Sequence, residues 1–366
     1  MKHIFIALLF LSAALLKVSA QGCVAIRSNG SSCTIQKPGG EENNWTFNAN
    51  YRYFRSFRHF KGTVEQTERL LQNTEVINYS NALDLSIGKK LNSRWSVNLD
   101  FPLLASTRSS LYEHGLVNGV YIKKERHNTS AFGLGDIRFA AYRWMIDPKK
   151  HTKLNVQAGL GIKFATGDYN YKDYWYNVGP GGSKELRTVD QSIQLGDGGT
   201  GLTTELNLYY MPSANINFYA NGYYLINPRN VNGTRTYRET LSPALANEDI
   251  MSVPDQYMAR VGASYSFSHI SGLSLSAGGR IEGIPVYDLV GGSDGFRRPG
   301  YVVSIEPGIG YAAKKINWYL NIPFAVSRNR TQSVTDKQRT KTSGTFQQGD
   351  AAFADYSINL GCAVKF

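Results

Sequence analysis

The chain has 366 residues, a formal net charge of +12 and three cysteines. Its 36 glycines, 23 tyrosines and 17 phenylalanines favour an all-β protein, because the Glu, Lys, Ala and Leu blocks that build long helices are scarce. After the first 20 residues no stretch approaches the roughly 18 consecutive apolar residues of a spanning helix, which excludes a helical membrane protein.

Residues 1–20 have the pattern of a secretory signal peptide. A basic start at Lys2 precedes an apolar run from Ile4 to Leu16, and the segment ends in a small-x-small cleavage site at Ala20. We therefore expect export from the cytoplasm and cleavage after Ala20.

The segment 21–44 begins in a Gly- and Ser-rich stretch that carries Cys23 and Cys33. An oxidising periplasm would join these two cysteines in a small disulfide-closed loop. The third cysteine, Cys362, belongs to the last predicted strand, where an apolar role is expected rather than a reactive one.

From Trp45 onward one pattern repeats: about 9 to 16 residues with apolar or aromatic side chains at every second position, and then a turn. Side chains alternate between the two faces of a strand, so each run has one apolar and one polar face. The clearest run extends from Leu154 to Phe164. Twelve runs share the pattern, over residues 45–59, 75–89, 94–104, 133–145, 153–165, 201–211, 215–227, 256–267, 272–284, 300–312, 315–327 and 354–366.

The connections between these runs alternate between short and long along the whole chain. Barrels of bacterial outer membranes have even strand numbers, short periplasmic turns and long outer loops. In hydrocarbon, a sheet satisfies its backbone groups only by closing on itself. Residues 45–366 are therefore predicted to form an all-β, closed antiparallel transmembrane β-barrel of about 12 strands in the outer membrane of a Gram-negative bacterium, with long extracellular loops.

The last run places Tyr356 and Phe366 in one apolar row. This row resembles the carboxy-terminal signal that the barrel-insertion machinery of the outer membrane recognises. We therefore expect that machinery, outer-membrane lipid and lipopolysaccharide as partners. The positive charge suits an anionic outer leaflet, and no nucleic acid is expected as a partner.

The polar faces of the runs place charged side chains of both signs in the barrel interior. Because buried charges persist only when they are paired, these residues form either an ion-pair network that braces the wall or a surface that binds a solute. Inward glycines, such as Gly159 and Gly361, either leave a narrow passage or only permit curvature of the sheet. The predicted lumen residues are Asp136, Arg138, Lys163, Glu205, Arg260, Arg280, Glu282 and Glu306, with Arg52, Asp84 and Asp100.

Three prolines, Pro102, Pro307 and Pro323, lie inside predicted strands, although proline cannot donate a hydrogen bond to the ladder. Each is expected to mark a bulge or a local break. Because Pro307 follows the inward charge Glu306, a break at this point would bend the strand or open a side exit.

The third long loop is rich in aromatic residues, which either belong to the aromatic girdle at the membrane rim or stack on a sugar or aromatic ligand. They are Tyr169, Tyr171, Tyr174, Trp175 and Tyr176. No catalytic residue is predicted, because no Ser-His pair of a membrane hydrolase lies along a strand. The spacing of His and Cys predicts no metal site, and no cofactor is expected.

Two short motifs carry a family resemblance: Gly133-Leu134-Gly135-Asp136-Ile137-Arg138-Phe139 and Ala165-Thr166-Gly167-Asp168-Tyr169. They resemble motifs of the outer-membrane proteins of the phenol meta-pathway family, which is loosely similar to the long-chain fatty-acid transporters. The family usually has Pro before Thr-Gly-Asp, where this chain has Ala165. The resemblance implies uptake of hydrophobic or aromatic compounds, with Asp136 and Asp168 as carried-over positions, and segment 21–44 as a periplasmic or plug segment.

Together these features predict an outer-membrane pore or transporter for a small-molecule solute, with hydrophobic or aromatic compounds ahead of oligosaccharides. The alternative is a non-conducting surface barrel that acts in adhesion or assembly through its loops. An enzyme is not expected.

Overall fold

The computed structural model describes residues 45–114, 116–117, 120–121, 125–237 and 241–366. Its main sheet is antiparallel and closes on itself, because the last strand, β21 (Ala351–Lys365), pairs with the first, β1 (Trp45–Lys61). The predicted closed antiparallel barrel is thereby confirmed. The expected signal peptide 1–20, the segment 21–44 and the Cys23–Cys33 disulfide lie outside the described residues.

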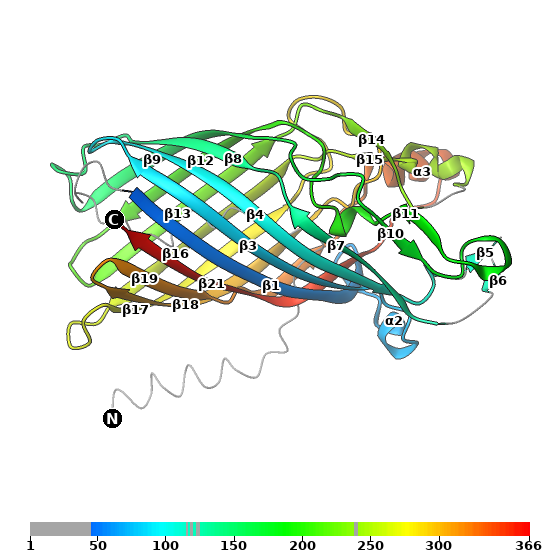
Figure 1. The fold of residues 1–366 in the computed structure, drawn as a ribbon, viewed down its shortest axis with the longest axis horizontal. Coiled ribbons are helices and arrows are strands. Elements are labelled where there is room, and N and C mark those ends of the chain that lie inside the picture. Colours follow the sequence, from blue (N-terminus) through cyan, green and yellow to red (C-terminus); the bar gives the residue numbers. More distant parts are fainter. Residues whose placement is uncertain (1–44, 115, 118–119, 122–124, 238–240) are drawn as a thin grey trace.

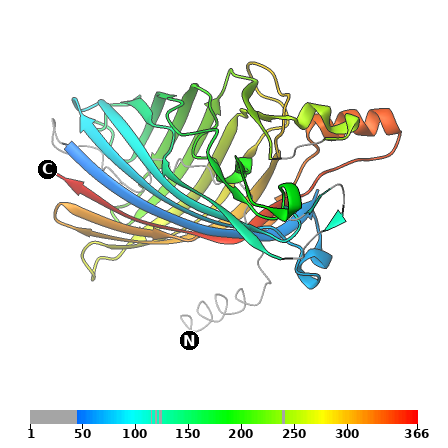
Figure 2. The ribbon, with the colours of Figure 1, turned by 45° about the vertical axis from the view of Figure 1, so that its right-hand side comes forward.

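The barrel wall has twelve strand positions, two of which are divided into two shorter strands (Figures 1 and 2). Besides β1 and β21, the undivided strands are β3 (Ile77–Lys90), β4 (Trp95–Ser110), β9 (Leu154–Lys163), β12 (Gly201–Tyr210), β13 (Ile216–Ile226), β16 (Gln256–Ser266), β17 (Leu273–Ile284) and β18 (Gly300–Ala313). The divided positions are β7 (His127–Leu134) with β8 (Arg138–Trp144), and β19 (Ile316–Asn321) with β20 (Phe324–Asn329).

Short elements gather at one end of the barrel, whereas tight turns and the carboxy terminus lie at the other end (Figure 1). These elements are β2 (Val64–Glu65), α2 (Thr67–Leu71), β5 (Leu116–Val117), β6 (Val120–Tyr121), β10 (Lys172–Trp175), η3 (Pro180–Gly182), β11 (Glu185–Thr188), η4 (Gln191–Ile193), β14 (Val231–Arg235), η5 (Pro243–Glu248), β15 (Ile250–Ser252) and α3 (Val334–Ser343). Among the described residues, no helix combines the length and the apolar character needed to cross a membrane.

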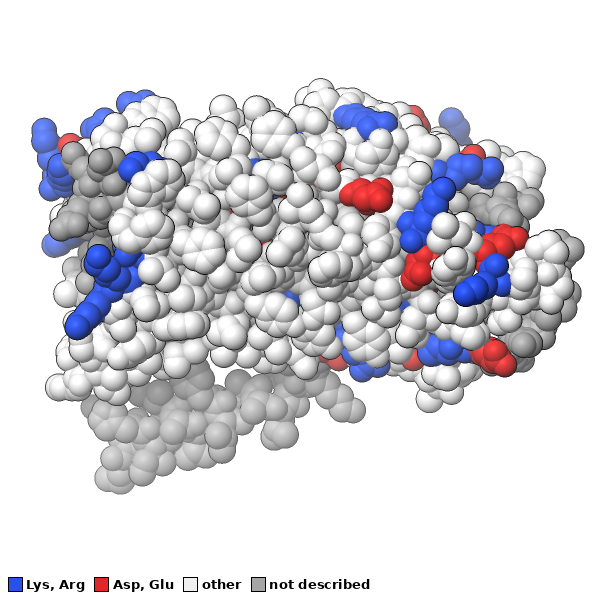
Figure 3. All heavy atoms as spheres, in the orientation of Figure 1, with Lys and Arg blue, Asp and Glu red and all other residues white. Residues whose placement is uncertain are grey.

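The outer surface is apolar around the middle of the barrel. In β13, Tyr219 and Tyr223 point inward and are buried, whereas Phe218 points outward and is 46% exposed. Figure 3 shows most charged side chains of the visible face gathered toward the two ends, with a largely uncharged belt between them. This belt is the surface that hydrocarbon requires of a membrane barrel.

The ladder between β4 and β7 continues well beyond the two predicted strands. It runs from Leu103 opposite Leu134 to Ser110 opposite His127, whereas the predicted strands covered 94–104 and 133–145. Small polar side chains, such as Thr107 opposite Ser130, replace the apolar row in this extension. The alternation that marks a strand facing lipid is therefore lost, although the backbone pairing continues.

Inward glycines accommodate tyrosine rings of neighbouring strands. A Cβ atom added at Gly361 would collide with the ring of Tyr319, and one added at Gly159 would lie 2.6 Å from Tyr142 Cε1. The Tyr319 hydroxyl reaches Asn50 Oδ1 at 3.2 Å. From the sequence, these glycines either leave a narrow passage or only permit curvature of the sheet. In the structure, tyrosine side chains fill the space beside them.

The division between β7 and β8 lies beside Pro102 of β4. In the ladder Pro102 would be opposite Gly135, and its carbonyl accepts a hydrogen bond from Gly135 N over 2.7 Å. Such a pair normally exchanges two hydrogen bonds, but proline has no N–H to return. The Gly135 carbonyl instead accepts from Thr166 Oγ1 over 2.9 Å, and the strand breaks at this point.

The division between β19 and β20 lies beside Pro307 of β18 in the same way. The Pro307 carbonyl accepts from Ile322 N over 3.0 Å, and the chain then passes through Pro323. Beyond this break, the one ladder pair between β20 and β21 among the described residues is Phe324 opposite Tyr356. Each proline was expected to mark a bulge or a local break. A break lies beside both Pro102 and Pro307, but in the neighbouring strand that lacks the donor, whereas β4 and β18 continue through the prolines.

Replacing Gly361 by alanine is expected to destabilise the barrel, because the added methyl group must displace the Tyr319 ring. We expect the free energy of unfolding to fall by about 1–3 kcal/mol in a urea titration of the detergent-folded protein. Gly279→Ala is the matched control, since an added Cβ at Gly279 meets nothing within 4 Å. Equal stability of the two variants would contradict this packing.

Candidate solute passage

Charged side chains of β16, β17 and β18 face one another on the inner wall. Arg280 Nη2 lies 2.8 Å from Glu282 Oε2, and Arg260 Nη1 lies 3.1 Å from Glu306 Oε1. A 3.5 Å contact between Arg280 and Glu306 joins the two pairs, and all four side chains are buried. Mutual pairing makes these charges tolerable inside the barrel.

The first half of the wall carries further polar contacts. Arg52 Nη2 lies 3.6 Å from Asp84 Oδ2, Tyr142 Oη donates to Glu205 Oε1 over 2.9 Å, and Asp100 Oδ1 accepts from Asn98 Nδ2 over 2.8 Å. These contacts agree with an ion-pair and hydrogen-bond network that braces the wall.

Asp136 lies in the break between β7 and β8. As a lumen charge it was expected to pair with Arg138 or with a neighbour, and its Oδ2 lies 3.2 Å from Lys163 Nζ of the neighbouring strand β9. Its Oδ1 accepts from Gly167 N over 3.0 Å, and Lys163 also bonds to Asp197. Because the break turns Asp136 away from the ladder, Lys163 of the neighbouring strand reaches it and Arg138 does not.

The two motifs that carry the family resemblance therefore meet at this break. Thr166 Oγ1 accepts from Ile137 N over 2.8 Å and donates to Gly135 O, while Gly167 N bonds to Asp136. Asp168 is exposed and its Oδ1 accepts from Asn170 N over 2.8 Å, as a turn residue does.

Part of the third loop folds into the barrel. Val189, Ile193 and Leu195 are buried against Ala82 of β3 and Leu104 of β4, with Ala131 of β7 completing the cluster. Leu195 packs on Gly133, where a Cβ would lie 2.8 Å from its Cδ1. This inward segment could not be predicted from the sequence, because residues 189–196 show neither a strand nor a helix period.

Asp190 anchors the inward segment and is completely buried. Its carboxylate accepts from both terminal nitrogens of Arg298, at 2.8 and 3.0 Å, and lies 3.5 Å from Arg108 Nη1. Burial alone would raise the pKa of Asp190, but the two guanidinium groups hold it well below its usual range. The contribution of Asp190 to stability is therefore present above the ordinary carboxylate pKa and is lost only as the pH falls through the lower pKa of the folded protein.

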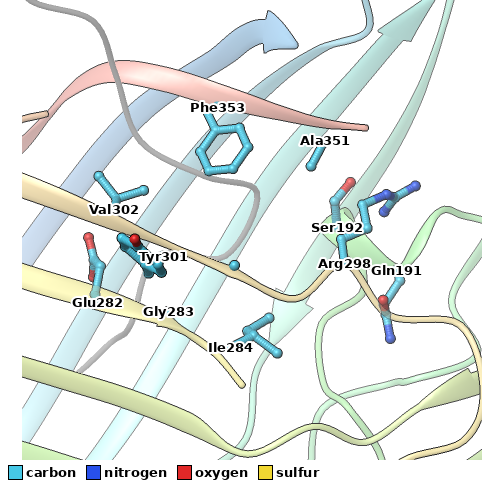
Figure 4. Close-up of a pocket in the computed structure, with 11 residues that line it drawn as sticks. Gln191, Ser192, Glu282, Gly283, Ile284, Arg298, Tyr301, Val302, Ala351 and Phe353 are labelled. Carbon is cyan, nitrogen blue, oxygen red and sulfur yellow. The ribbon is translucent and has the colours of Figure 1, made fainter. Parts of the chain in front are cut away.

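Two cavities adjoin the inward segment. The larger has about 1060 Å³ of space between atoms, part of it open to bulk solvent, and the smaller about 530 Å³ (Figure 4). Gln191, Ser192 and Ile284 line both, so the inward segment separates them. The lining of the larger cavity combines charged residues of the lumen with the apolar side chains of Phe54, Leu104, Leu225 and Met251. The lining of the smaller cavity includes Val302, Ala351 and Phe353.

The loop aromatics form neither a simple girdle nor an open stacking platform. Trp175 is 1% exposed and stacks on Tyr237 at 4.7 Å between ring centroids, with His114 at 5.2 Å. Tyr174 and Tyr176 are exposed, Tyr171 packs against the inward segment, and Tyr169 lies beneath Arg229. Burial lowers the pKa of His114 to about 4. Trp175 therefore belongs to the core of the loops.

The carboxy-terminal row lies on the outer face. Tyr356 is 42% exposed and Phe366 62% exposed, and the backbone of Phe366 pairs with that of Trp45. Cys362 is a free thiol. Within the part of the chain that the structure describes, no group of three His, Cys, Asp or Glu side chains is placed to hold a metal ion.

Comparison with protein-family models found no match, and neither did a search of curated proteins. Solved structures are similar to this chain. An outer membrane channel from Pseudomonas putida F1 is 11% identical, with a TM-score of 0.57 over 90% of this chain and 98% of that chain. The translocator domain of the autotransporter NalP from Neisseria meningitidis is 10% identical, with a TM-score of 0.45 over 90% and 91% of the two chains.

At this level of identity the similarity to the Pseudomonas putida channel shows the fold alone. It agrees with the closed antiparallel barrel and its largely uncharged belt, so the fold is that of a membrane β-barrel. The phenol meta-pathway resemblance depends on the two motifs and stays a prediction.

Asp190→Asn is expected to loosen the inward segment, because it leaves Arg298 without its buried carboxylate. We expect amide hydrogen exchange in residues 189–196 to accelerate at least tenfold. Breaking a buried ion pair costs several kcal/mol, and a tenfold change requires only part of that free energy. Asp168→Asn is the control, since it makes the same change at an exposed position of the same loop. Unchanged exchange in Asp190→Asn would show that the ion pairs do not hold the segment.

Proposed function

We propose that this barrel is an outer-membrane channel that takes up small hydrophobic or aromatic compounds. The observation that carries the proposal is the position of the larger cavity beside the break between β7 and β8. Asp136, Gly196 and Asp197 belong to the surroundings of the break and also line the cavity. A solute in the cavity thus lies next to the place where the wall ladder is interrupted.

The edge of β7 differs from the rest of the wall. β8 pairs with β9 from Trp144 opposite Gln157 to Arg138 opposite Lys163, and β9 ends there. Among the described residues, β7 pairs only with β4 and meets β10 on its other side through Ser130 N, which donates to Asp173 Oδ2 over 2.7 Å. A wall without a continuous ladder gives an apolar solute a lateral route that a fully paired wall does not.

The cavity lining supports apolar solutes over oligosaccharides. Phe54, Leu104, Leu225 and Met251 contribute apolar surfaces beside the polar and charged residues of the lining, and small-molecule sites likewise combine apolar contacts with polar groups that orient the ligand. Contact of the loops with lipopolysaccharide and delivery by the insertion machinery are part of the same proposal, and no catalytic step is needed.

Expression of the full chain in a Gram-negative host that lacks channels for hydrophobic compounds tests the proposal. We expect uptake of a radiolabelled monoaromatic compound, supplied at low concentration, to rise several-fold. Ala82→Trp, which fills the cavity, is expected to remove most of the increase, whereas Ala158→Trp, on the lipid face of β9, is expected to keep it.

Two results would contradict the proposal. Uptake that never exceeds that of the empty host would favour the surface barrel that acts in adhesion or assembly. Oligosaccharide flux in a liposome-swelling assay, without a gain in monoaromatic uptake, would favour a porin.

A further inference from the structure

Arg138 carries a positive charge on the inner wall of the barrel. It lines the larger cavity, its Nε atom is buried with nothing to bond to, and it forms no hydrogen bond or ion pair with any described residue. Asp100 stands directly opposite Arg138 in the ladder between β4 and β8, but its carboxylate accepts from Asn98 instead. An unpaired guanidinium inside a barrel is costly unless something else meets it.

The other cations of the cavity are already engaged. Five charged side chains line it, namely Arg52, Asp136, Arg138, Lys163 and Asp197. Lys163 bonds to both carboxylates, and Arg52 pairs with Asp84, which lies outside the lining. The lining therefore has one cation more than it has carboxylates, and Arg138 is the one that has no ion pair among the described residues.

A second unused group lies next to Arg138. The guanidinium carbon is 5.9 Å from the ring centroid of Tyr223, and the buried Tyr223 hydroxyl has no hydrogen-bond partner. Tyr223 is 4% exposed, so its hydroxyl is not freely solvated. Arg138, which lines the cavity, and the neighbouring Tyr223, which lies behind the lining, thus both have unused donor capacity. The rest of the lining includes Phe54, Leu104 and Leu225.

We propose that Arg138, assisted by Tyr223, binds the carboxylate of a small aromatic acid whose ring lies against the apolar wall of the cavity. The planar guanidinium offers parallel N–H groups that match the two oxygens of a carboxylate, which a lysine or an amide does not. The inference rests on the proposed function, since it names a class of solute for the same cavity. It distinguishes aromatic acids from neutral aromatic compounds of equal size.

Calorimetric titration of the detergent-solubilised full chain with benzoate and with benzamide tests the assignment. The two ligands have the same ring and nearly the same shape, but only benzoate is anionic. We expect wild-type protein to bind benzoate about tenfold more tightly than benzamide, a difference typical of one hydrogen-bonded charge pair. Arg138→Gln should lower the affinity for benzoate to that for benzamide and leave the affinity for benzamide unchanged.

Arg143→Gln is the matched control, because Arg143 belongs to the same strand but points outward and lies over Trp95. It should leave the preference for benzoate intact. Tyr223→Phe should lower the affinity for benzoate more than the affinity for benzamide. The folded state of each variant is checked by its heat-modifiable mobility in gel electrophoresis.

Equal affinity of the wild-type protein for benzoate and benzamide would overturn the assignment but would not contradict the proposed channel. This comparison uses the wild-type protein alone. A preference for benzoate that survives in folded Arg138→Gln would also overturn it. If neither ligand binds and uptake of the neutral monoaromatic is also absent, the proposed function itself fails.

Discussion

Every backbone N–H and C=O group that lies in hydrocarbon needs a partner from the protein, because no water is present to supply one. Pairing of β21 with β1 meets this requirement by closing the sheet. The same requirement explains the two divided strands. Pro102 and Pro307 each accept a hydrogen bond from the neighbouring strand without returning one, and the neighbour breaks where the donor is missing. At the first break the Thr166 hydroxyl replaces that donor.

The first break also organises the interior. It turns Asp136 toward Lys163 and lets the third loop enter the barrel, where Leu195 packs on Gly133 and Asp190 is held by Arg108 and Arg298. The loop divides the outer part of the lumen into two cavities, and charge pairs brace the wall around them. One irregularity of the ladder thus positions the loop, the cavity and the unpaired Arg138.

The fold could be predicted from the sequence because alternation is local: each residue of β13 shows on which face it lies, and Phe218 and Tyr219 lie on the faces that the pattern indicates. The partners of inward charges could not be predicted, because they depend on register and on the break; Asp136 pairs with Lys163, not with Arg138. Glycines at 159 and 361 left open either a passage or curvature of the sheet, and tyrosines from other strands occupy the space beside them. The inward segment around Asp190 has no periodic pattern, so only tertiary structure reveals it.

A cysteine scan of β13, with the native cysteines replaced by alanine, tests the closed cylinder most directly. A fluorophore would be attached at each position from 217 to 223, and quenching by brominated acyl chains would be compared with quenching by aqueous iodide. Positions 218, 220 and 222 should respond to the lipid quencher, and positions 217, 219, 221 and 223 should not. Equal aqueous quenching at all seven positions would mean that this strand does not separate hydrocarbon from a lumen.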